Sequence, residues 1–245
     1  MFHFEVLHND KSCNARLGIL KTSHGLIETP VFMPVGTQAA VKTLSPADLK
    51  NCDIRIILTN TYHLYLRPGW ELIRDLKGLH NFMSWDRPIL TDSGGFQIFS
   101  LRPLVKICEQ GVTFQSHLDG SYHFLTPENI IEIQEGLGAD IIMVLDECPP
   151  YPSTYDYTLN SIRLTLRWAQ RGMKTHKRRD QALFGIVQGG MFKDLREICC
   201  NQLISLDLAG YAIGGLCVGE SSSQTSEIIQ HTLPLLPQAK PRYIM

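Results

Sequence analysis

Residues 89–97 read ILTDSGGFQ, and this stretch decides the fold class. Two apolar residues and a threonine lead to Asp92, and the turn Ser93-Gly94-Gly95 follows. The pattern is typical of a buried strand that places a carboxylate at its C-terminal end. The glycines let a ligand approach the backbone closely, because they carry no Cβ atom. We therefore expect a strand-end site here.

Other apolar runs end in the same way. IIMVLDECP (141–149), FGIVQGG (184–190) and YAIGGLCVGE (211–220) each place polar or glycine residues after a strand. Three further strand candidates are residues 31–36, 54–62 and 242–245. Helical patterns separate the seven candidates, which predicts an α/β fold of the (β/α)8 TIM-type barrel class. No eighth strand precedes Met245, so we expect an incomplete barrel.

Two antiparallel segments accompany the predicted barrel. The first 30 residues alternate in polarity around a hairpin turn at Ser23-His24-Gly25. Between residues 104 and 125 short strands are broken by Gly111 and Gly120, which predicts an antiparallel insertion on the barrel rim. We treat residues 1–245 as one barrel domain that contains this insertion.

Composition limits the classes of function. The net charge is −1, so the chain as a whole is not a polyanion binder, and any nucleic-acid contact must be local. No membrane span or signal peptide is evident, so we expect a cytoplasmic protein without membrane contact. Seven cysteines lack CxxC spacing and the histidines lack HExxH spacing. These patterns predict reduced thiols and no metal site in this chain.

Asp92 has two interpretations. It is either a solvated turn aspartate or a general acid/base or nucleophile, whose pKa partial burial raises. Asp146, at the end of VLD, is either a loop or cap acid or a carboxylate that accepts two hydrogen bonds from a planar N–H/NH2 edge, such as that of guanine. Gln188 could then reach O6 of the same ring, and Gly214-Gly215 offers bare backbone. Together these residues suit a purine-like base.

Two other features are less specific. His63 and Tyr62 follow the second strand, where packing is the preferred interpretation. A basic run spans residues 163–179, and it is either a solvated helix end or a phosphate-contacting patch. Its members are Arg163, Arg167, Arg171, Lys174, Lys177, Arg178 and Arg179.

Five motifs in register, TNTYHLYLRPG, ILTDSGGFQIFSL, VLDECPPYP, GIVQGG and IGGLCVGE, closely resemble the bacterial tRNA-guanine transglycosylases. The likeness covers essentially the whole chain. It implies a (β/α)8 barrel that exchanges guanine at the tRNA wobble position for a 7-deazaguanine, by double displacement through a covalent RNA–enzyme intermediate. The substrates implied are tRNA and the free base.

The resemblance also assigns roles to individual residues. Asp92 becomes the general acid/base, and Ser93, Gly94, Gly95 and Phe96 form the floor of the base pocket, with Phe96 stacking on the ring. The side chains of Asp146 and Gln188 bind the edge of the base, and Gly215 adds a backbone contact. Val218 favours the smaller base, 7-aminomethyl-7-deazaguanine, over queuine.

The chain departs from the family pattern in one respect. The nucleophilic aspartate of the family and its Cys3His zinc site would both fall beyond Met245. We therefore expect no cofactor in this chain, zinc only in a complete family member, and little or no activity of these 245 residues alone. A homodimer is expected by analogy.

Three alternatives remain at this stage. The first is a non-catalytic homologue that partners an active subunit. The second is an RNA-binding module that uses the basic run. The third is an unrelated barrel enzyme that acts on a phosphorylated metabolite, although the glycine-rich phosphate site typical of such barrels is not evident.

Overall fold

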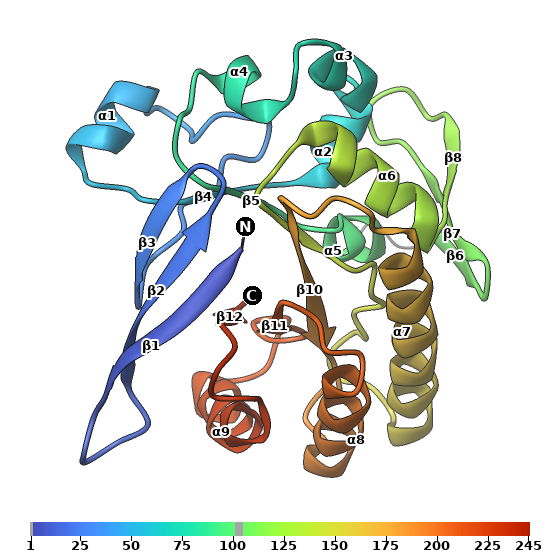
Figure 1. The fold of residues 1–245 in the computed structure, drawn as a ribbon. Coiled ribbons are helices and arrows are strands. Elements are labelled where there is room, and N and C mark those ends of the chain that lie inside the picture. Colours follow the sequence, from blue (N-terminus) through green and yellow to red (C-terminus); the bar gives the residue numbers. More distant parts are fainter. Residues whose placement is uncertain (1, 101–104) are drawn as a thin grey trace.

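The computed structural model describes residues 2–100 and 105–245. Its centre is a curled, wholly parallel sheet of six strands in the order β12-β11-β10-β9-β5-β4, which forms an incomplete TIM-type barrel (Figure 1). The strands are β4 (Ile57–Thr59), β5 (Ile89–Thr91), β9 (Ile141–Met143), β10 (Ala182–Val187), β11 (Gly210–Ile213) and β12 (Arg242–Ile244). Nearly all their residues from β4 to β11 are buried apolar ones, as expected for strands covered on both faces. The predicted fold class is confirmed.

One predicted barrel strand is reduced to a single bridge. Of residues 31–36, only Val35 pairs with the sheet, opposite Leu58. Pro34 lacks an N–H group and cannot extend the ladder, although its carbonyl accepts from the Leu58 N–H at 3.0 Å. The parallel sheet therefore has six regular strands among the described residues, rather than the seven expected.

Helices connect the strands, and the longer ones lie along the outer face of the curled sheet (Figure 1). The helices that match the helical patterns between the strand candidates are α1 (Pro46–Asn51), α3 (Trp70–Asp75), α6 (Pro127–Leu137), α7 (Tyr155–Thr175), α8 (Lys193–Ile204) and α9 (Ser222–Thr232), which leads into the 3-10 turn η1 (Leu233–Leu235). Two helix ends are capped by local sequence: Ser45 and Asp48 form a capping box on α1, and Gly138 ends α6 with a φ of 72°.

Three short helices were not expected. They are α2 (Thr61–Leu66), α4 (Leu79–Met83) and α5 (Gly95–Ser100). Each has only five or six residues, too few for an apolar period to show, and helices of this length depend on tertiary contacts. As a result, the predicted glycine turn after Asp92 is also the start of a helix.

Both predicted antiparallel segments form three-stranded sheets. The N-terminal sheet contains β1 (His3–Asn9), β2 (Arg16–Thr22) and β3 (Gly25–Thr29), and the second contains β6 (Val105–Cys108), β7 (Gly111–Gln115) and β8 (Tyr122–Leu125). Residue 104, the first of the predicted insertion, lies outside the described residues. The division into a barrel domain and an insertion stays a prediction.

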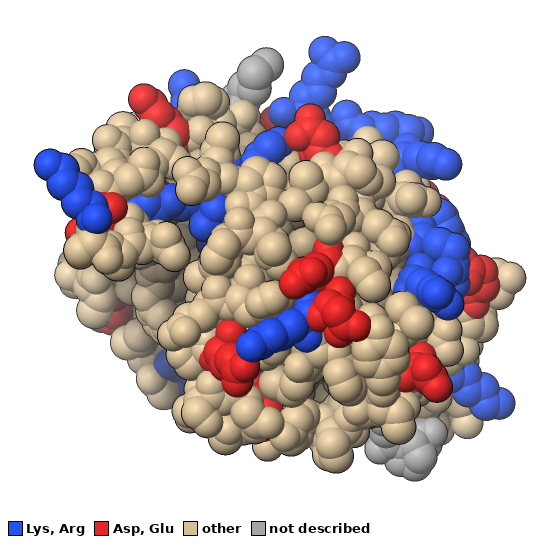
Figure 2. All heavy atoms as spheres, turned by 90° about the horizontal axis from the view of Figure 1, so that it is seen from below, with Lys and Arg blue, Asp and Glu red and all other residues tan. Residues whose placement is uncertain are grey.

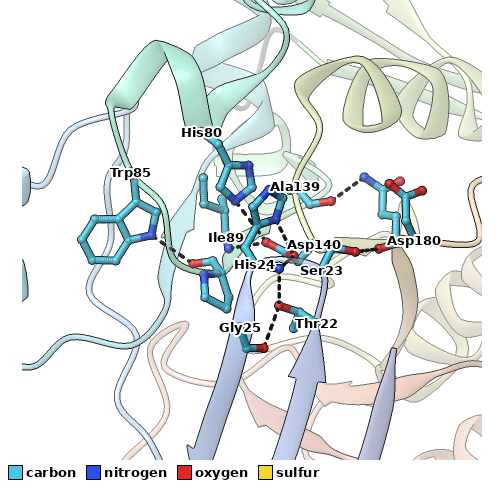
Figure 3. Close-up of polar contacts among 12 residues, drawn as sticks. Thr22, Ser23, His24, Gly25, His80, Trp85, Ile89, Ala139, Asp140 and Asp180 are labelled. Atoms are coloured by element: carbon cyan, nitrogen blue, oxygen red, sulfur yellow. Dashed lines mark hydrogen bonds and ion pairs between the residues drawn. The ribbon is translucent and has the colours of Figure 1, made fainter. Parts of the chain in front are cut away.

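Asp140, just before β9, links the N-terminal sheet to the barrel by hydrogen bonds (Figure 3). Its buried carboxylate accepts from the His24 N–H at 3.2 Å and from the Ile89 N–H at 3.0 Å. His24 Nδ1 lies 2.8 Å from Oδ1 and His80 Nε2 lies 3.2 Å from Oδ2, and the two rings stack at 3.5 Å. Burial alone would raise the pKa of Asp140, but the hydrogen bonds from His80, His24 and Ile89 lower it to about 2. The β2–β3 turn, α4 and the first residue of β5 are thus joined through the Asp140 carboxylate.

None of the helices formed by the described residues has the length and apolar content that crossing a membrane requires.

Candidate functional site

A cavity of about 480 Å³ lies at the C-terminal ends of the parallel strands. Five consecutive strands each contribute to its wall, one to three residues after the strand ends. These residues are Asn60 after β4, Asp92 after β5, Asp146 after β9, Gln188 after β10, and Gly214 with Gly215 after β11. This is the position at which parallel α/β barrels carry their sites. Of the predicted site residues, all except Gly94 line the cavity, and Gly94 lies between two that do.

Three hydrogen bonds hold the carboxylate of Asp92 in the lining of this cavity. Its Oδ1 accepts from the backbone N–H groups of Thr61 at 2.9 Å and Gly94 at 3.0 Å, and its Oδ2 accepts from Asn60 Nδ2 at 2.5 Å. The side chain is 6% exposed. Burial raises the pKa of Asp92, and the hydrogen bonds oppose that rise. A carboxyl group with a raised pKa, fixed in the cavity lining, can exchange a proton with a bound ligand.

Asp146 faces the same cavity and is paired with an amide. Its Oδ2 accepts from Gln188 Nε2 at 2.6 Å, and its Oδ1 accepts from Ser93 Oγ at 3.3 Å. Burial raises the pKa of Asp146 to about 6, and the neighbouring charge of Asp92 adds to the increase. Gln188 Oε1 is buried without a hydrogen-bond partner. The pair therefore offers acceptor and amide groups whose hydrogen bonding a ligand could complete.

The glycines at the cavity are required by close contacts. Gly94 has a φ of 77°, and a Cβ atom there would lie 3.0 Å from Tyr62. A Cβ atom on Gly95 would lie 2.8 Å from the Asp146 carboxylate. A side chain at either position would therefore displace the carboxylate or the helix α2 beside it. Phe96 lines the cavity but is half exposed, with its ring accessible at the cavity wall.

The loop after β11 is stabilised by Glu220. Its carboxylate accepts from the Cys217 N–H at 2.6 Å and the Val218 N–H at 2.9 Å. Burial raises the pKa of Glu220, but the hydrogen bond from Thr225 and these backbone bonds outweigh burial and lower it. Cys217 has a φ of 56°, in the left-handed region. Glu220 thus compensates a turn that a non-glycine residue adopts only with support.

Sequence reasoning missed two polar residues of this site. Asn60 directly follows β4, so the strand-end pattern that identified Asp92 also applies to it. Arg196, in α8, is 0% exposed and contacts the loops that carry Gln188 and Gly215. No sequence signal marks it, because a charged residue in an amphipathic helix is normally assigned to the solvent side.

The basic run does not join this cavity. Arg167, Arg171 and Arg178 form ion pairs with Glu109, Glu128 and Asp180. Arg178 also donates to the Glu135 carbonyl near the end of α6, which lies at the opposite strand ends from the cavity.

Tyr62 and His63, which are neighbours in sequence, have different surroundings. Tyr62 is buried and its hydroxyl lies 2.8 Å from His117 Nδ1, as the packing interpretation expects, whereas His63 lines the cavity. Figure 2 shows charges of both signs interspersed over one face of the molecule, with Lys and Arg gathered along one edge. That face is therefore not uniformly basic.

Within residues 2–100 and 105–245, one group of potential metal ligands converges, formed by His24, His80 and Asp140. The three come from different elements, so sequence spacing could not reveal them. The 2.8 Å separation of His24 Nδ1 and Asp140 Oδ1 is a hydrogen-bond distance. Two ligands of one tetrahedral zinc, with bonds of about 2.0 Å, would lie roughly 3.3 Å apart. The His24–Asp140 contact is therefore a hydrogen bond, whereas the 3.2 Å separation of His80 Nε2 and Asp140 Oδ2 is close to the zinc value.

Comparison with known proteins gives a consistent family match. The family described as queuine tRNA-ribosyltransferase matches residues 10–245. Proteins named queuine tRNA-ribosyltransferase from Halothermothrix orenii and Caldanaerobacter subterraneus subsp. tengcongensis are 60% and 61% identical over 99% of the chain. A protein of the same name from Listeria monocytogenes serotype 4a is 56% identical over 99%. The chain spans 65%, 65% and 64% of the length of these three relatives.

Proposed function

This chain belongs to the queuine tRNA-ribosyltransferase family, and from that premise we propose that its cavity is the base-binding site of a tRNA-guanine transglycosylase. Such an enzyme exchanges guanine at the wobble position of tRNA for a 7-deazaguanine. The observation that carries this proposal is the buried pair Asp146–Gln188, which faces the same cavity as Asp92. A cytoplasmic location follows from a tRNA substrate.

Base recognition follows from the donors and acceptors on the cavity wall. The ionised Asp146 carboxylate accepts from N1–H and the 2-amino group of guanine, an edge that adenine does not present. The Gln188 amide N–H and the Gly215 N–H donate to the carbonyl oxygen O6, which neighbours N1 on the same edge of the ring, and Phe96 contributes the stacking face. A base without the matching groups leaves buried polar atoms unpaired, which is the strongest source of discrimination in such a pocket.

Proton transfer is assigned to Asp92. Base exchange with retention of configuration proceeds by double displacement, in which one carboxylate attacks C1′ and another group moves the proton. The raised pKa of Asp92 and its fixed position suit the proton transfer. Asp146 is committed to the base edge. The described lining of the cavity therefore offers no third carboxylate as nucleophile.

Zinc and a homodimer are further proposals that rest on the family. A Cys3His site needs three cysteines, and the one converging group among the described residues, His24, His80 and Asp140, contains none. The described residues therefore do not fit the zinc site of the family, and no step is assigned to a metal here.

Calorimetric binding of guanine and adenine to the purified chain tests the proposal. We expect guanine to bind and adenine to bind at least 100-fold more weakly, because adenine offers no N1–H or 2-amino donor to Asp146. D146N should lose most guanine affinity, since its amide presents N–H groups to the donors of the base. D75N, an exposed change on α3, is the matched control and should bind normally. Equal affinity for the two bases would sink the proposal.

A further inference from the structure

Arg196 is a fully buried cation whose partners are backbone carbonyl groups. Its Nη1 donates to Val187 at 3.0 Å and to Gly214 at 2.8 Å, and its Nε donates to Gly190 at 3.0 Å. Its Nη2 lies 3.4 Å from the Gly215 carbonyl oxygen. One side chain from α8 therefore holds both loops that form this wall of the cavity.

Glycine at position 189 leaves room for the Arg196 side chain, and the guanidinium group is buried while charged. A Cβ atom on Gly189 would lie 3.0 Å from the Cγ and Cδ atoms of Arg196, and Gly189 has a φ of 148°. Burial lowers the pKa of Arg196 to about 10, so the guanidinium remains charged at neutral pH. A buried charge without a carboxylate partner is expensive, which suggests a task beyond packing.

The direction of the Gly214 carbonyl determines the direction of the next N–H. The Gly214–Gly215 peptide is trans, and in a trans peptide the C=O and N–H groups point to opposite sides. Because the Gly214 carbonyl points at Arg196, the Gly215 N–H points away from it. Gly215 lines the cavity, and the backbone hydrogen bonds of the described residues leave its N–H without a partner. A charge-assisted bond to the carbonyl also polarises the attached N–H.

We propose that Arg196 is a positioning residue that orients the Gly214–Gly215 peptide, so that the Gly215 N–H donates to the carbonyl oxygen of a 6-oxopurine base. The inference rests on the proposed function, because it assumes that such a base occupies the cavity. It adds a determinant of specificity that does not itself touch the base.

The affinity ratio of guanine to 6-thioguanine tests this role. The two bases share the N1–H and 2-amino groups, but sulfur is the weaker acceptor at position 6. We expect the wild-type chain to favour guanine by roughly tenfold, the effect of one hydrogen bond. In R196M the ratio should fall toward one, and R196K, which keeps the charge and part of the bonding, should lie between. R178K is the control, since Arg178 also donates to a backbone carbonyl but at the other strand ends.

The outcomes separate the two proposals. If the wild-type chain binds neither base, the proposed function fails and this inference falls with it. If the wild-type chain prefers guanine, and if R196M and R196K keep the same affinity ratio, Arg196 only stabilises the two loops. This inference alone is then overturned. Should R196M fail to fold, R196K and the amide resonance of Gly215 in the wild-type chain decide. That resonance should move further downfield with guanine than with 6-thioguanine, and equal shifts would overturn the role.

Discussion

At the residue scale, the cavity contains two carboxyl groups whose burial opposes their charge. Asp92 and Asp146 are 6% and 5% exposed, and the pKa of each is raised. Hydrogen bonds from Asn60, Thr61 and Gly94 offset part of the penalty at Asp92, whereas Asp146 relies on Gln188 and Ser93. The two buried carboxyl groups therefore lower the free energy of unfolding, as is common for preorganised polar sites.

Asp146 provides a test of this cost. Its pKa is about 6 in the folded chain and about 3.8 when exposed. The folded state then binds the proton more tightly, so this group adds stability as pH falls through 6 and lowers stability above that value. D146N mimics the protonated form, and we expect it to raise the free energy of unfolding by about 1–3 kcal/mol at pH 7.

Urea unfolding of wild type and D146N at pH 7 and near pH 4 measures the effect. The gain should shrink at the lower pH, where Asp146 is already protonated in the folded chain. An unchanged difference between the two pH values would contradict a raised pKa. The same variant should bind guanine poorly, so stability and binding are expected to change in opposite directions.

At the element scale, the N-terminal sheet is joined to the barrel through Asp140. The β2–β3 turn supplies His24, α4 supplies His80, and the chain before β5 supplies the Ile89 N–H. Ser23 adds a hydrogen bond to the Asp180 carbonyl (Figure 3). These polar contacts act at the N-terminal ends of the strands, in addition to the apolar packing of Leu20 and Ile27 in the core.

Substitution of Asp140 should loosen this junction. Its folded pKa of about 2 lies below the ordinary 3.8, so its contribution is fully present above pH 4 and is lost as pH falls toward 2. We expect D140N to reduce the free energy of unfolding by roughly 2 kcal/mol at pH 7. Hydrogen exchange should accelerate first in β1 to β3. D180N, on a largely exposed acid, is the control and should change stability little. Uniform acceleration over the whole chain would argue against a local junction.

At the scale of the whole molecule, the parallel sheet brings distant residues to one rim. The residues that follow β4, β5, β9, β10 and β11 span more than 150 positions in sequence, from Asn60 to Gly215, yet they line one cavity. The same curled sheet places the basic end of α7 at the opposite strand ends. The proposed base-binding cavity and that basic region are thus separate features of the fold.

This arrangement predicts binding without turnover for these 245 residues. Asp92 and Asp146 are assigned to proton transfer and base recognition, which leaves no cavity carboxylate among the described residues to attack C1′. We expect no incorporation of labelled guanine into tRNA, while guanine binding persists. Measurable incorporation would refute this division of roles. Binding of tRNA that falls steeply with salt and survives D92N would instead favour an RNA-binding subunit.

The sequence alone determined the barrel class and the strand-end residues. Alternating apolar strands and helices are local patterns, and ILTD, VLD and GIVQ each carry a polar group at a fixed place after a strand. The lining of one cavity by Asp92, Asp146, Gln188 and Gly215 follows directly from that rule. The role of each residue in the reaction stays a prediction.

Only the tertiary structure decided the rest. Helices α2 and α5 are too short to be stable without the packing around them, and the sequence shows no helical period of apolar residues there. Asp140, His24 and His80 come from three elements, and no spacing links them. Arg196 is buried because carbonyl groups of two separate loops converge on it. Burial and hydrogen bonding of this kind are properties of contacts between distant segments, which a local pattern does not encode.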